Sequence, residues 1–186
     1  MKFNYKQSIY SKFKFLFTFL VISIVIGIVI YLFTDAETKN IIDLSLEDLI
    51  SNLSHKKQNN ILFHLSILSI VSLLSYYIIG ILGSIFLYGY EGISIGYLIA
   101  SLLHYKKIKG IYYSIVFITI NKLIYLILLT YLLYISWLYL NNYIKNKYRI
   151  PNSSTYLFRM IIITLIVFIN DIFLYYFGNQ LISFFI

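Results

Sequence analysis

The sequence of 186 residues contains no cysteine, a single proline and only seven acidic residues. Without cysteine the chain can form neither a disulfide nor a thiolate metal site. The three histidines, His55, His64 and His104, are far apart and do not have the spacing of metal ligands. Glycine-rich phosphate loops and nucleophile elbows are also missing. These absences predict a chain with no catalytic residue, no cofactor and no metal site.

Acidic residues are rarer still inside the apolar runs. An intramembrane protease needs paired aspartates, a Ser–His pair or zinc ligands within its spans. Asp171 is the only aspartate in an apolar run. Hydrolysis by this chain alone is therefore not expected, and we predict that the protein is not an enzyme.

Apolar side chains are abundant: 60% of the residues are hydrophobic and the mean hydropathy is +0.83. A soluble fold of this length would lack the polar residues to cover its surface, so we predict an integral membrane protein in contact with the lipid bilayer. The net charge of +8 comes from clusters at the ends of apolar runs, which is typical of charges that set membrane topology. Nucleic acid is not an expected partner, because its binding needs a basic face on soluble structure.

The first apolar run, residues 15–33, is long enough to cross a hydrocarbon core of ~30 Å as a helix. Four lysines and no acid precede it, which predicts a cytoplasmic N-terminus. A cleavable signal peptide is the alternative, because Thr34, Asp35 and Ala36 weakly resemble a cleavage site. The run is longer than the apolar part of a usual signal peptide and more runs follow, so a permanent span is favoured.

Residues 34–60 form the one substantial polar segment, with five acids and three lysines. Ser45 precedes Asp48 at the spacing of a capping box. Behind it, one face of a helix would be apolar, formed by Leu46, Leu49, Ile50 and Leu53. We predict a short amphipathic helix near the outer membrane surface. The alternative is a solvated linker helix with no partner.

Residues 61–103 contain Glu91 as their only Asp, Glu, Lys or Arg. This run is too long for one crossing and sufficient for two, joined by a turn at Gly80 and Gly83 or at residues 89–92. Runs at 111–140 and 156–186 follow. We predict a single domain over residues 1–186: an all-α polytopic membrane helical bundle with about five transmembrane helices. In a four-span alternative, residues 61–103 are re-entrant and the lysines at 106, 107 and 109 are cytoplasmic.

Four of the eight glycines fall within residues 88–110. Gly92, Gly96 and Ala100 recur every four residues and would form one smooth stripe on a helix, with Gly110 following at a basic turn. Because lipid provides no hydrophobic force between helices, close backbone approach along such a stripe becomes a main means of packing. We predict a helix-packing or partner-binding surface; the alternative is a chance match within an apolar helix.

Two charged residues, Lys122 and Asp171, fall near the middle of the last two spans. A charge at that depth costs at least ~2.5–3.5 kcal/mol on insertion scales. We therefore predict that the two side chains pair and that Asn121 and Asn170 complete their hydrogen bonds. A structural lock is the favoured interpretation. An ion or proton relay, snorkelling, and contact with a partner protein are the alternatives.

Glu91 lies between Tyr88 and Tyr90. Tyrosines favour the membrane interface. We therefore expect Glu91 at a helix break that reaches interfacial water, and a carboxylate at membrane depth is the alternative.

The second half of the chain resembles a known family in three short motifs. A charged residue before glycine leads into a Gly-x-x-x-Gly helix, a Lys-Gly turn follows, and a serine lies near the start of the next span. These motifs are Glu91-Gly92-Ile93-Ser94-Ile95-Gly96, Lys109-Gly110 and Ser114. Together with the order of spans and polar segments along nearly the whole chain, they resemble the stage II sporulation protein M family.

One departure concerns the fourth span, where the family usually carries a Pro-Gln-Asn run. This chain has Ile120, Asn121 and Lys122 there. The resemblance therefore does not extend to a kink or a role that depends on the proline.

The resemblance implies a non-enzymatic scaffold in the bacterial cell membrane, on the mother-cell side of an endospore-forming cell. Such proteins assemble with two partners that degrade peptidoglycan during engulfment, a lytic transglycosylase and an amidase. Residues 34–60 would then contact an extracytoplasmic domain, and the stripe from Gly92 to Ala100 would contact a partner's transmembrane helix.

A second hypothesis is a small permease, or the membrane subunit of a transporter, that uses Glu91, Lys122 and Asp171 as a polar path. The sequence shows no clear internal repeat and no pair of broken helices in matching positions, which disfavours this reading. A third hypothesis is a structural membrane protein of no defined pathway.

Overall fold

The computed structural model describes residues 3–51, 78–145 and 153–185, and every element within these ranges is helical. The elements are α1 (Phe3–Phe33), α2 (Ala36–Ser51), α4 (Ile78–Lys106), α5 (Lys109–Asn121), α6 (Leu123–Lys145), α7 (Ser153–Phe173), the π-helix η1 (Leu174–Gly178) and α8 (Asn179–Phe185). Four stretches of the described residues are long and apolar enough to cross a membrane: Phe13–Phe33, Leu82–Lys106, Leu123–Asn141 and Ser154–Phe185. The predicted all-α polytopic membrane bundle is confirmed.

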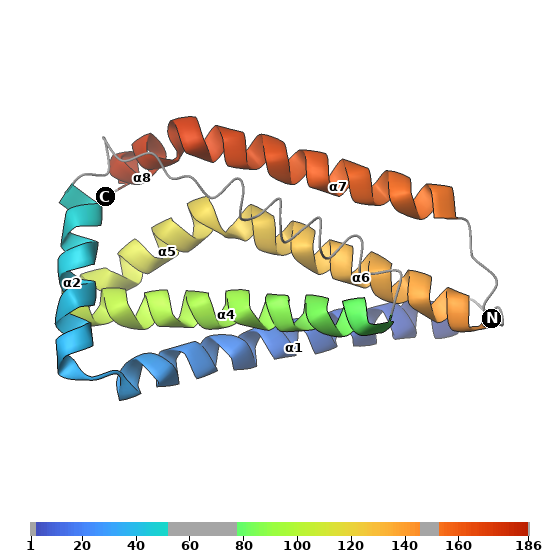
Figure 1. Ribbon diagram of the computed structural model, residues 1–186, viewed down its shortest axis with the longest axis horizontal. Helices are drawn as coiled ribbons and strands as arrows, with labels where there is room; N and C mark the ends of the chain where they lie inside the picture. The colour runs from blue at the N-terminus through green and yellow to red at the C-terminus, as the bar shows by residue number, and fades with distance from the viewer. Residues whose placement is uncertain (1–2, 52–77, 146–152, 186) are drawn as a thin grey trace.

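The helices run roughly along one axis, with α2 lying across one end (Figure 1). α1 and α4 pack side by side, α5 and α6 together form a bent arm above α4, and α7 lies on the far side of α6 (Figure 1). One apolar core joins α1, α4, α6 and α7 through buried side chains such as Leu16, Tyr88, Leu129 and Met160. A second core, at the end of the bundle where α2 lies, joins α2, α4, α5 and α8 through Leu46, Leu102, Phe117 and Ile182.

The end of α4 and the start of α5 lie at the same end of the bundle as α2 (Figure 1). His104 Nδ1 near the end of α4 lies 3.1 Å from Asp43 Oδ2 of α2. The four-span alternative is therefore wrong, because it puts the lysines at 106, 107 and 109 at the opposite end, with the start of α1. The first of the two crossings predicted within residues 61–103 falls mostly outside the described residues.

The turn predicted at Gly80 and Gly83 or at residues 89–92 is wrong, because α4 is one continuous helix from Ile78 to Lys106. Glycine breaks soluble helices partly because water competes for the exposed backbone, and the bilayer core contains no water to do so. The turn comes later, at Lys107, whose φ of 53° lies in the left-handed region. The Gly110 N–H then donates to the Lys107 carbonyl at 2.9 Å and starts α5.

The run at residues 111–140 is not a single helix, since α5 ends at Asn121 and α6 begins at Leu123. Lys122, between them, has φ −120° and ψ −23°. Its N–H still donates to the Ile118 carbonyl at 2.9 Å, and its own carbonyl accepts from the Leu126 N–H at 2.9 Å. The chain therefore bends here without proline and keeps hydrogen bonds on both sides of the bend.

The amphipathic helix predicted within residues 34–60 is present, but it begins at Ala36 and not at Ser45. Asp35 is the capping residue: its carboxylate accepts from the Thr38 N–H at 2.9 Å and from the Thr38 hydroxyl at 2.7 Å. These bonds hold the pKa of the Asp35 carboxyl below its usual range. Ser45 lies in mid-helix, where its hydroxyl donates to the Ile42 carbonyl at 2.7 Å.

Candidate functional site: a glycine seam and an intramembrane ion pair

The glycine stripe of α4 lies against α1. A methyl group at Gly96 would overlap the Ile24 carbonyl oxygen, and one at Gly92 would lie 2.6 Å from Ser23 Cβ. From the other side, a methyl group at Gly27 of α1 would overlap the Ile93 carbonyl oxygen. The two backbones are therefore in direct contact, and we call this contact the glycine seam. Such close approach is how small residues pack membrane helices.

The predicted helix-packing role of Gly92, Gly96 and Ala100 is thus taken up within the chain. All three residues are buried. A partner's transmembrane helix cannot lie on the same surface, so that part of the prediction needs correction. The sequence feature that marks α1 as the opposing helix is in the first span, where Ser23 and Gly27 have the same four-residue spacing.

Gly110 serves a second close contact, at the turn between α4 and α5. A methyl group there would overlap the Leu102 carbonyl oxygen. The Ser114 hydroxyl, one turn later, donates to the Gly110 carbonyl at 2.7 Å. Gly110 therefore lets the first turn of α5 lie directly on the last turns of α4.

An ion pair joins the middle of α4 to the bend between α5 and α6. Lys122 Nζ lies 2.9 Å from Glu91 Oε2 and donates to Ser94 Oγ, also at 2.9 Å. The Glu91 side chain is only 3% exposed and that of Lys122 is 23% exposed. A charge at membrane depth is tolerated when an opposite charge and hydrogen bonds accompany it. This arrangement supplies both.

Two predictions about these residues are wrong. Lys122 pairs with Glu91 and Ser94, not with Asp171. Glu91 is not at a helix break, because it lies within continuous α4, directly before the glycine seam. The antiparallel neighbours α6 and α7 suggested the first pairing, but the bend at Lys122 also brings this residue next to α4.

Asp171 is buried in α7, three residues before the π-helix η1. Tyr125 of α6 is buried in the same part of the bundle as Asp171 and Glu91, so the two carboxylates belong to one polar region. Asn121 and Asn170 do not complete the hydrogen bonds as predicted. Within the described residues, Asn121 Oδ1 and Asn170 Nδ2 are buried without a hydrogen-bond partner.

Two irregular helix segments meet beside this polar region. The first is the bend at Lys122, and the second is η1, which contacts α5. Asn121 Oδ1 lies 3.9 Å from the position that a methyl group on Gly178 would take. π-helical turns are uncommon and occur often at functional sites. No cluster of three potential metal ligands occurs among the described residues.

The glycine seam generates a prediction with a matched control in the same helix. Gly96→Ala should push α1 away from α4 and lower the free energy of unfolding by about 1–3 kcal/mol, because the added methyl group has no room. Gly83→Ala should leave it unchanged or raise it by up to about 1 kcal/mol, because nothing lies within 4 Å of the added methyl group. Thermal unfolding in detergent measures both. Equal effects would contradict the seam.

The ion pair generates a second prediction. Lys122→Met should destabilise the protein by roughly 3 kcal/mol, because it leaves the Glu91 carboxylate buried without its cation. Adding Glu91→Gln to Lys122→Met should restore most of the loss, since both charges are then gone. The exposed Lys109→Met is the control and should be nearly neutral. Additive effects of the two single changes would show that the residues are not coupled.

The comparisons with known proteins do not assign a family. No family model matches the chain, and no curated protein or solved structure matches it.

Proposed function

We propose that the chain is a non-enzymatic scaffold of the bacterial cell membrane, of the kind that stage II sporulation protein M represents. In this role it assembles peptidoglycan-degrading enzymes on the outer surface during engulfment. The observation that carries the proposal is α2, a helix fixed across one end of the bundle.

α2 has two distinct faces. Its inner face packs on α4, α5 and α8 through Leu46 and the half-buried Ile42, Leu49 and Ile50. Its outer face exposes two large apolar side chains, Ile41 at 62% and Leu44 at 66%. Glu37 and Asp48 share that outer face and are also exposed. An apolar pair between acids is suited to a partner surface that is apolar at its centre and basic at its rim.

The orientation of α2 is fixed at both of its junctions with the bundle. Lys39 Nζ donates to the Leu32 carbonyl at the end of α1, at 3.1 Å. Asp43 lies 3.1 Å from the His104 ring at the end of α4. α2 is therefore held as part of the bundle and does not act as a solvated linker. A rigid surface of this kind reduces the entropy lost when a partner binds.

The partners that we propose are the extracytoplasmic domains of a lytic transglycosylase and an amidase. Both act outside the membrane, and the four lysines at the N-terminus favour an orientation with α2 on that side. The membrane in question is that of the mother cell if the source organism forms endospores. Expression timed to sporulation, or a gene neighbourhood of engulfment proteins, would support this context.

A specific observation favours a permease as the second candidate. The bend at Lys122 and the π-helix η1 form a pair of interrupted helices beside Glu91 and Asp171. Interrupted helices at the bilayer midplane are typical of substrate and ion sites in transporters.

The scaffold proposal predicts a loss of binding from changes on the outer face of α2. Ile41→Ser combined with Leu44→Ser should lower capture of a candidate partner by at least about tenfold, because buried aromatic and aliphatic anchors dominate binding energy. Co-purification of the full chain with the partner measures this. Asn40→Ala, also exposed on α2, is the control and should leave capture unchanged. Undiminished capture by the double variant would reject the outer face as the binding surface.

The two candidate functions differ in their dependence on the ion pair. For a scaffold, the double variant Glu91→Gln, Lys122→Met should capture partners as the wild type does, because the pair then only joins α4 to the bend. For a permease, the same variant should fold and yet lose ion or substrate flux in reconstituted vesicles. If vesicles with the wild-type protein show flux and vesicles with this variant do not, the scaffold hypothesis is rejected in favour of the permease.

A further inference from the structure

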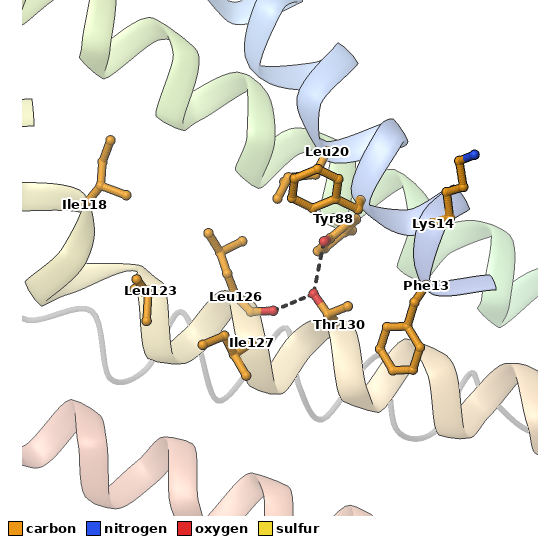
Figure 2. Close-up of a pocket in the computed structure, with 10 residues that line it drawn as sticks. Phe13, Lys14, Leu20, Tyr88, Ile118, Leu123, Leu126, Ile127 and Thr130 are labelled. Carbon is orange, nitrogen blue, oxygen red and sulfur yellow. Dashed lines mark hydrogen bonds between the residues drawn. The ribbon is translucent and has the colours of Figure 1, made fainter. Parts of the chain in front are cut away.

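A cavity of about 640 Å³ lies between α1, α4, α5 and α6 (Figure 2). Its wall is mostly apolar, with Leu20, Leu126 and Ile118 among the lining residues. Other lining side chains are themselves exposed, including Phe17 of α1 and Ile127 of α6. The cavity therefore opens sideways, between α1 and α6, towards the surroundings of the bundle.

The cavity runs along the bundle. Lys14 and Phe13 lie at one end, and Ile118 and Leu123 lie at the other (Figure 2). Lys14 is at the very start of the first span, whereas Leu123 directly follows the bend at Lys122. From Leu123 to Thr130 the rise of α6 covers about 10 Å. This is most of one leaflet of a hydrocarbon core of ~30 Å.

Among the described residues that line the interior of the cavity, none offers a free polar group that would hold water. The hydroxyl oxygens of Thr130 and Tyr88 lie 2.9 Å apart, and the Thr130 hydroxyl also lies 2.7 Å from the Leu126 carbonyl (Figure 2). An apolar cavity with satisfied walls stays dry and binds apolar ligands, as a cavity of ~150 Å³ binds one benzene molecule. By that measure this cavity holds on the order of twenty carbon atoms. A transmembrane helix about 10 Å wide and about 25 Å long is several times larger.

Lys14 gives the cavity a charge at one end only. Its side chain is exposed, beside a wall that is otherwise apolar. Lys14 closes the N-terminal segment, which has four lysines and no acid. A lysine at this depth reaches the interface, where lipid phosphate groups lie. The cavity therefore combines a cation at the interface with an apolar interior of about one leaflet's depth.

We propose that this cavity binds one anionic phospholipid, with an acyl chain between α1 and α6 and the headgroup phosphate at Lys14. The lipid occupies the space between α1 and the bent pair of helices α5 and α6. This site is independent of the scaffold proposal, because it lies between the spans and shares no residue with α2.

The test uses the full chain purified in detergent with equal amounts of phosphatidylglycerol and phosphatidylcholine, followed by native mass spectrometry. The wild type should retain one phosphatidylglycerol per chain, preferred about fivefold over phosphatidylcholine, the factor expected for one lysine near an anionic headgroup. Lys14→Gln should retain a lipid and lose the preference. Equal retention of the two lipids by the wild type, or a second copy of the chain in place of the lipid, would overturn the proposal.

A matched pair of variants separates this site from the general lipid shell. Leu123 lines the cavity and is 41% exposed, whereas its neighbour Ile124 is 44% exposed and is not among the lining residues. Leu123→Trp should fill the inner end and reduce the retained lipid to background. Ile124→Trp should retain the lipid as the wild type does. Equal retention by two variants that unfold at the same temperature would overturn the proposal, and the wild-type competition tests it even if Leu123→Trp does not fold.

Discussion

The direct contact between the backbones of α1 and α4 is the constraint on which the rest of the bundle depends. It exists because both helices place glycine at the contact: Gly27 faces the Ile93 backbone, Gly96 faces the Ile24 backbone, and Gly92 faces Ser23. In a bilayer, such packing replaces the hydrophobic force that drives soluble cores together. The contact fixes the position of α4 against α1. This position places Glu91 of α4 next to the bend between α5 and α6. The same contact removes the stripe from any surface that a partner could use.

The membrane class, the first span and the amphipathic α2 were predictable, because long apolar runs and an apolar helix face depend only on local sequence. The close packing at Gly92 and Gly96 was predictable as well, because residues four apart lie on the same face of a helix. The identity of the opposing helix was not. Many helices can accept a smooth stripe, and the matching spacing of Ser23 and Gly27 is recognised only when the two are considered together. The pairing of Lys122 with Glu91 depends on a bend that no proline marks.

Polar groups at membrane depth are concentrated in one region of this bundle. Lys122 pairs with Glu91 and donates to Ser94, and Tyr125 is buried in the same part of the bundle as Glu91 and Asp171. Nearby, Asn121 and Asn170 have buried polar atoms without partners among the described residues. A hydrogen-bonded ion pair beside buried amide atoms that lack partners suits a lock that holds helices in register. It also suits an ion or substrate path in which a ligand completes the hydrogen bonds. Changes at Glu91 and Lys122 therefore separate the proposed scaffold from the proposed permease.

The sequence separation of the ion pair has a consequence for biosynthesis. Glu91 leaves the ribosome 31 residues before Lys122, so the carboxylate reaches the insertion machinery before its cation has been made. α4 would then enter the bilayer with an uncompensated charge, which is costly. Holding α4 at the translocon until the bend at Lys122 arrives avoids this cost. α4, α5 and α6 then leave the translocon as one unit, and the glycine contact with α1 gives that unit a place to dock.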